Sequence, residues 1–167
     1  MTTDRSRTPA RKPMPERASA STVPEKISES TWRRLVEAAT RARENAYAPY
    51  SHYPVGAAVL GADRKIHSGC NVENSSYGAT FCAERNAVGQ AVASGEQRIL
   101  AAVVLTGSTP PAPPCGICLQ TFAEFAGAEL PILLVNPAGE ARGLSLQELL
   151  PHAFGPDDLD GGEAGGD

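Results

Sequence analysis

Two short cysteine segments constrain this chain more than any other feature of its sequence. They are Cys82-Ala83-Glu84 and Pro114-Cys115-Gly116-Ile117-Cys118, and each falls after a loop-like stretch at the predicted start of a helix. At such a place, backbone N–H groups and the helix dipole favour thiolate over thiol, and thiolate is the form that binds zinc. The fold therefore has to bring the beginnings of two helices to one metal ion.

Three cysteine ligands would leave a tetrahedral zinc with one open position, which is typical of a catalytic site rather than a closed structural one. The gap of two residues between Cys115 and Cys118 lets both sulfurs reach one ion. Taken alone, this pair would also suit a structural or redox site, and four cysteines would allow two disulfides. We expect the remaining one, Cys70, to be a small buried apolar residue.

Two charged residues follow the first cysteine of the predicted site. Glu84 stands two positions after Cys82, so its carboxylate can lie beside a metal without binding it, where a proton carrier for water is needed. Three thiolates on one Zn²⁺ give a net negative centre, and Arg85 is the cation that could compensate it. The alternative for Arg85 is an ordinary ion pair on the helix surface.

Apolar patterns in the rest of the chain predict alternating helices and strands. We expect helices over 30–47, 82–94, 118–125 and 146–150, and strands over 55–60, 65–69, 99–105 and 132–135. This alternation predicts an α/β domain with a mixed sheet of about five strands covered by helices.

Composition predicts one domain with two unstructured ends. We expect a disordered, basic, Pro-rich leader over 1–27, a folded domain over 28–158 and a loose acidic and Gly-rich tail over 159–167. The formal net charge of −4 combines about +3 in residues 1–26 with −7 in the remainder, which argues against a long nucleic acid as ligand. Neither a secretory signal nor an apolar run of about 20 residues is found, so we expect a cytoplasmic protein without a membrane partner.

The cysteine segments lie within a longer pattern that resembles the zinc-dependent cytidine deaminases of the short, homotetrameric type. The resemblance spans about residues 30–158. Besides the cysteine segments, with Arg85 after the first, it rests on the stretches Ala46-Tyr47-Ala48-Pro49-Tyr50-Ser51, Val55-Gly56-Ala57-Ala58, Gly69-Cys70-Asn71-Val72-Glu73-Asn74 and Glu148-Leu149-Leu150-Pro151, with Phe154.

This resemblance implies a three-layer α/β/α fold, one zinc ion per chain, and hydrolytic deamination of cytidine and 2′-deoxycytidine to uridine and 2′-deoxyuridine with release of ammonia. It implies that Cys82, Cys115 and Cys118 are the zinc ligands and that Glu84 is the proton carrier. It also implies that Arg85 bonds to the ligand thiolates.

The resemblance further implies a set of substrate-binding residues. Asn71 and Glu73 would bind the sugar hydroxyls, and Ala83 belongs to the same set. Tyr53 would stack on the pyrimidine, at a position where the family usually has Phe. Phe154 would reach a neighbouring subunit's site, which implies a homotetramer with shared active sites. The alternative for both aromatic residues is a place in the core.

One departure from the family pattern leaves other functions open. Leu119-Gln120 stands where the family usually has Arg-Gln, which would alter charge or subunit contacts near the site. A deaminase of a modified cytidine or of a nucleoside antibiotic is therefore an alternative. A catalytically silent zinc-binding subunit, or a nucleic-acid-binding module that uses the basic leader, is a third hypothesis, against which the intact Glu84 argues.

Overall fold

The computed structural model describes residues 26–160, so most of the predicted leader (1–27) and tail (159–167) lies outside the described residues. Its elements, in chain order, are α1 (Glu29–Glu44), β1 (Gly56–Gly61), β2 (Ile66–Cys70), the 3₁₀ helix η1 (Tyr77–Ala79), α2 (Ala83–Ala93), β3 (Ile99–Leu105), α3 (Gly116–Phe125), β4 (Pro131–Val135), β5 (Ala141–Ser145), α4 (Leu146–Leu149) and α5 (Pro156–Asp160).

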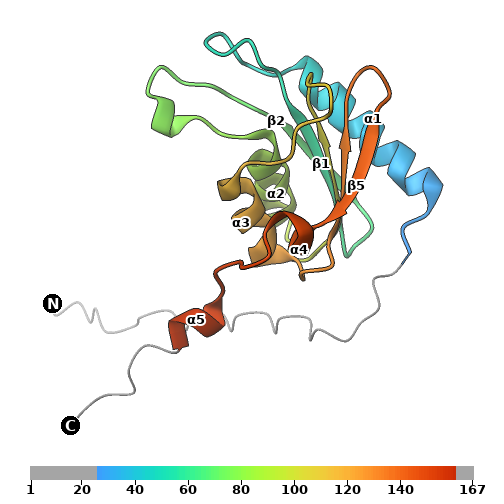
Figure 1. Ribbon diagram of the computed structural model, residues 1–167, viewed down its shortest axis with the longest axis vertical. Helices are drawn as coiled ribbons and strands as arrows, with labels where there is room; N and C mark the ends of the chain where they lie inside the picture. Colours follow the sequence, from blue (N-terminus) through green and yellow to red (C-terminus); the bar gives the residue numbers. More distant parts are fainter. Residues whose placement is uncertain (1–25, 161–167) are drawn as a thin grey trace, which may run out of the picture.

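The five strands form one mixed sheet in the order β2-β1-β3-β4-β5. Only the β3–β4 pair is parallel, and the other three pairs are antiparallel. α1 covers one face of this sheet, while α2, α3 and α4 lie on the other (Figure 1). The structure therefore confirms the predicted three-layer α/β/α fold with a five-stranded sheet.

Each central strand supplies both halves of the core, because successive side chains of a strand point to opposite faces. In β1, Ala57 and Val59 pack with α2 and α3, whereas Ala58 and Leu60 pack with α1. The run of small apolar residues that predicted this strand is thus the signature of a strand buried on both faces.

α1 begins and ends slightly earlier than the sequence pattern predicts. Its N-cap is Ser28 rather than Ser30, because the Ser28 hydroxyl accepts a hydrogen bond from the Thr31 N–H at 3.2 Å. At the other end, the backbone N–H of Asn45 bonds to carbonyls of the last turn, so the helix does not continue to Tyr47.

Glycine at position 69 lets α2 lie directly against β2. A Cβ atom built on Gly69 would lie only 2.7 Å from the Ala87 nitrogen and 2.9 Å from the Ala83 carbonyl oxygen, so any larger residue would push the helix away. The Asn86 side chain adds a 2.8 Å hydrogen bond to the Cys70 carbonyl. These contacts fix the beginning of α2 relative to the end of β2.

Four strand ends meet at one edge of the sheet, and this edge carries most of the predicted functional residues. Gly56, where β1 begins, pairs with Cys70, where β2 ends, and with Leu105, where β3 ends. Leu105 in turn pairs with Val135 at the end of β4. The segments that lead into β1 and out of β2, β3 and β4 are therefore brought together.

Three elements were not predicted from the sequence, namely η1, β5 and α5, and α3 begins earlier than expected. β5 was missed because its first three residues are exposed and include Arg142, so it lacks an apolar run. α5 occupies part of the stretch that was predicted to be loose, and the Asp158 carboxylate accepts a 2.7 Å hydrogen bond from the Gly155 N–H ahead of it. α3 begins at Gly116 rather than at Cys118. None of the described helices is both long and apolar enough to cross a bilayer.

Candidate metal and catalytic site

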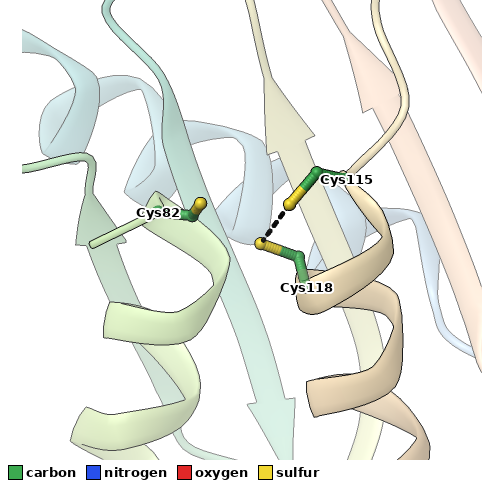
Figure 2. A group of neighbouring side chains, drawn as sticks. All are labelled: Cys82, Cys115 and Cys118. Carbon is green, nitrogen blue, oxygen red and sulfur yellow. Dashed lines mark hydrogen bonds between the residues drawn. The ribbon is translucent and has the colours of Figure 1, made fainter. Parts of the chain in front are cut away.

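The three predicted ligands lie at the N-termini of two neighbouring helices. Cys82 is the N-cap of α2 and Cys115 is the N-cap of α3, both with extended backbone. Cys118 is buried in the first turn of α3. Figure 2 shows the three thiols directed toward one another from these two helices. Both helix N-termini favour negative charge at this point, which suits thiolate ligands.

The thiol positions fit a zinc ion. All three Sγ atoms lie within 4.8 Å of one another, and the Cys115 thiol donates to the Cys118 sulfur at 3.6 Å. Zn–S bonds of about 2.3 Å at tetrahedral angles would place the sulfurs about 3.8 Å apart. Within residues 26–160 this group contains three ligand atoms, so it would leave one coordination position for water or substrate.

The thiols polarise one another before any metal binds. The pKa of Cys82 is lowered to about 6, first by a hydrogen bond from the Cys118 thiol, and further by Cys115 and by the charge and N–H groups of Arg85. The pKa of Cys118 is raised, first by its hydrogen bond to Cys82, then by burial and by the charge of Glu84. Cys82 is therefore the first of these two thiols to ionise.

Glu84 lies beside the thiols in a largely dry environment, with only 5% of its surface exposed. Burial raises the pKa of its carboxyl group, and the negative charge of Cys82 raises it further. Hydrogen bonds from its own backbone N–H and from the Cys118 thiol act in the opposite direction. A raised pKa suits a carboxyl group that has to accept a proton as well as return it.

Arg85 lies between Cys82 and an aromatic ring. Its guanidinium carbon is 4.7 Å from the centroid of the Phe81 ring, which is within the range of a cation–π interaction. The same guanidinium acts on the Cys82 thiol through its charge and a hydrogen bond. The Arg85 guanidinium is therefore close enough to donate to the Cys82 sulfur, and the Phe81 ring restricts its position.

A second group of predicted residues forms around the segment that leads into β1. The Asn71 side chain is buried and bonds to the Tyr53 carbonyl and to the Val55 N–H, both at 2.9 Å. The Glu73 carboxylate accepts hydrogen bonds from the backbone of Tyr50 and Ser51 and from the Ser51 hydroxyl. The hydrogen bond from the Ser51 side chain is the main cause of a lowered pKa at Glu73.

Three further residues that the sequence singled out differ in burial: Ala83 and Leu119 are buried, whereas Phe154 is exposed. Ala83 is fully buried at the beginning of α2. Phe154 is 57% exposed, and within residues 26–160 no hydrogen bond or ring contact joins its side chain to the rest of the site. Leu119 is buried in the core between α2, α3 and the sheet. The apolar residue at position 119 therefore fills the core instead of presenting a charge at the surface.

Sequence reasoning missed the residues that hold these groups in place. Phe81 and Ser108 lie outside the stretches that carry the resemblance. Ser51 lies within one of them, but nothing in that stretch indicates its bond to Glu73, because all three contacts are visible only in the folded chain. Asn136 is a partial exception. It is a polar residue directly after a buried strand, and that position could have marked it, because residues at strand ends of an α/β sheet commonly line its site.

Three thiols converge at paired helix N-termini, with a buried carboxyl group alongside, and this arrangement fits a zinc hydrolase site in which three protein ligands leave one position of the metal open. The match to known proteins makes the class more specific. A family model described as "Cytidine and deoxycytidylate deaminase zinc-binding region" matches residues 29–134, and the chain belongs to this family. The match and the thiol geometry together confirm zinc as the predicted cofactor.

Individual relatives agree with the family model. The chain is 44% identical over 126 residues to the cytidine deaminase of Sporosarcina psychrophila, which covers 75% of this chain and 93% of that protein. It is 44% identical over 128 residues to the cytidine deaminase of Mycobacterium tuberculosis, covering 77% and 92%. The crystal structure of cytidine deaminase from Burkholderia pseudomallei superposes with a TM-score of 0.70 at 45% identity, covering 73% of this chain and 98% of that one.

Proposed function

We propose that this chain is a zinc-dependent hydrolase that deaminates cytidine and 2′-deoxycytidine to uridine and 2′-deoxyuridine with release of ammonia. The observation that carries the proposal is the buried Glu84 carboxyl group beside three convergent thiols. Relatives named cytidine deaminase that match most of the chain support the substrate.

The chemistry requires a nucleophile and a proton carrier. Zinc held by Cys82, Cys115 and Cys118 would supply Lewis acidity that makes a water molecule nucleophilic near neutral pH. Glu84 accepts a proton from the attacking water and delivers it to ring nitrogen N3. It then takes the remaining proton from the new hydroxyl on C4 and passes it to the amine, so that the C4 carbonyl forms and ammonia departs. Its raised pKa supports this exchange, because such a carboxyl group both accepts and returns a proton readily.

A nucleoside requires recognition of the sugar as well as of the base. In the proposal, Glu73 and Asn71 bind the sugar hydroxyls and Tyr53 stacks on the pyrimidine. The lowered pKa of Glu73 supports its part, since the group stays a carboxylate that accepts hydrogen bonds from hydroxyls. Leu119 lies in the core, so its exchange for the family's arginine does not favour a modified substrate.

The proposal includes a homotetramer in which Phe154 completes a neighbouring subunit's site. The 57% exposure of this phenylalanine supports the idea, because a large apolar side chain in water is available to a second subunit. We also propose a cytosolic location, where reducing conditions keep the ligand thiols available for zinc. Sedimentation of the zinc-loaded protein tests the assembly, and a monomer with full activity would contradict it.

The experiment that tests the function is an assay of the purified, zinc-loaded protein with cytidine. We expect loss of cytidine absorbance, release of one ammonia per uridine, and turnover of 2′-deoxycytidine in the same assay. Free cytosine should be a much poorer substrate, because it lacks the sugar that Asn71 and Glu73 bind. A zinc-loaded protein that leaves cytidine unchanged would contradict the proposal.

A further inference from the structure

A hydrogen bond between two side-chain hydroxyls joins two loops at the functional edge of the sheet. The Tyr53 hydroxyl lies 2.5 Å from the Ser108 Oγ, although the residues are 55 positions apart. Tyr53 lies in the segment that leads into β1, and Ser108 lies in the loop that runs from β3 toward Cys115. The antiparallel pairing of Gly56 with Leu105 brings these two loops together.

The backbone of Tyr53 is held independently of this hydroxyl bond. Its carbonyl accepts a 2.9 Å hydrogen bond from the buried Asn71 side chain, and its N–H donates to the Ser51 hydroxyl at 3.1 Å. The ring is therefore fixed at the backbone end by Asn71 and at the hydroxyl end by Ser108. It remains 37% exposed, so part of the ring is available for contact with a ligand.

Ser108 is itself held from the sheet. Its carbonyl accepts a 3.0 Å hydrogen bond from the Asn136 side chain, which also lies 3.3 Å from the Thr109 hydroxyl. Asn136 is only 5% exposed and follows β4 directly, so it is a fixed point of the core. Farther along the same loop, the Ala112 N–H bonds to the Thr106 hydroxyl at 3.0 Å. The loop is thus a rigid support for the Ser108 hydroxyl.

We propose that Ser108 is a positioning residue that fixes the Tyr53 ring for binding of the pyrimidine base. This inference rests on the proposed function. A ring that is already oriented does not have to be ordered when the nucleoside binds, and avoiding that cost improves affinity. A phenylalanine at position 53 would lack the hydroxyl and would leave Ser108 without this partner. The hydrogen bond that holds the ring therefore requires both Tyr53 and Ser108.

The test compares steady-state kinetics on cytidine for Tyr53→Phe, Ser108→Ala and the double variant, each loaded with zinc. We expect each single change to raise KM about threefold to tenfold, the range of one ordinary hydrogen bond, with kcat within about twofold. The double variant should match the single ones, because both remove the same interaction. Ser108→Thr keeps a hydroxyl and should restore KM.

Matched controls remove hydroxyls that have no partner among the described residues. Tyr77→Phe and Ser75→Ala are changes of the same kind in a neighbouring loop, and neither should change KM. Zinc content and melting temperature are measured for every variant, so that a loss of metal or of folding is recognised.

Three results would overturn the inference while leaving the proposed function intact. These are an unchanged KM in both single variants, effects that multiply in the double variant, and a fall in kcat that accompanies a lower melting temperature. If the wild-type protein fails to turn over cytidine, the proposed function itself fails, and the inference loses its basis. Wild-type turnover therefore separates the two failures.

Discussion

Glu84 and Glu73 lie in different surroundings, and the pKa values of their carboxyl groups are shifted in opposite directions. Glu84 lies at the beginning of α2, is almost fully buried beside the thiols, and has a raised pKa. Glu73 lies in a loop, accepts three hydrogen bonds from the 50–51 turn, and has a lowered pKa. Burial favours the neutral form of a carboxyl group, whereas hydrogen-bond donors favour its charged form.

Metal binding and proton transfer would depend on the two helix N-termini, whereas recognition of the nucleoside would depend on loops held by hydrogen bonds. The residues that would hold metal and move protons come from two helix N-termini, where backbone dipoles help to set their charge. The residues that would recognise the nucleoside come from loops, and side-chain hydrogen bonds hold them in place. Substitutions at the helix N-termini should therefore reduce turnover most, and substitutions in the loops should mainly change the affinity for the substrate.

The largest effect should follow from removal of a thiol on the helix side. Cys118→Ser replaces a soft ligand with a poor one, so we expect loss of bound zinc and loss of activity to background. Metal analysis and the cytidine assay measure the two effects. Cys70→Ser is the matched control, because Cys70 lies outside the thiol cluster, and it should keep both zinc and turnover. A Cys118→Ser protein with full zinc would contradict the ligand assignment.

Removal of the proton carrier should have the next largest effect. Glu84→Gln keeps the shape of the side chain but cannot accept a proton, so kcat should fall about 10³-fold while zinc stays bound. Glu37→Gln, an exposed change on α1, serves as control and should leave kcat unaltered. If Glu84→Gln reduced kcat less than tenfold, another group would have to carry the proton.

A smaller effect is expected at the arginine that supports the cluster. Arg85→Gln removes the cation beside Cys82, so zinc affinity should fall about tenfold, as is usual for groups that support metal ligands. Competition with a chelator measures the affinity without reference to turnover. Arg33→Gln, which breaks only an exposed ion pair with Glu29, is the control. Equal affinity in the two variants would limit Arg85 to a surface role.

The smallest effect concerns the pH response of the loop carboxylate. The lowered pKa of Glu73 means that it stays ionised to lower pH, and the stability it contributes is lost only as pH falls through that lowered pKa. NMR titration of the Glu73 carboxyl carbon should give a midpoint below the ordinary value of 4.5. Ser51→Ala removes the main cause and should move the midpoint upward, whereas Ser75→Ala should not. A midpoint at or above 4.5 in the wild type would contradict the hydrogen-bond pattern.

The sequence predicted the positions of the thiols and of Glu84 within their helices, because local spacing determines these positions. Two residues between Cys115 and Cys118 place both sulfurs within one helical turn, and Glu84 is fixed by its position in the first turn of α2. The buried strands were predicted for a similar reason, since continuous apolar runs such as Ile99–Leu105 are typical of strands covered on both faces.

The hydrogen bonds that hold the loop residues could not be predicted from the sequence, because they are contacts between segments far apart in the chain. Nothing near Ser108 in the sequence indicates that its hydroxyl meets Tyr53, and nothing near Ser51 indicates that it bonds to Glu73. Leu119 is similar, because its place in the core follows from how α3 packs against α2 and the sheet. The resemblance to known deaminases predicts which loop residues bind the substrate, and the contacts show what holds those residues in place.

X-ray absorption at the zinc edge of the purified protein reports the atoms bound to the metal, and these atoms distinguish an open catalytic site from a closed structural one. We expect one zinc per chain with three sulfur ligands at about 2.3 Å and one lighter oxygen or nitrogen ligand at about 2.0 Å. Four sulfur ligands would contradict this expectation, because a closed site leaves no position for water and would make the zinc structural.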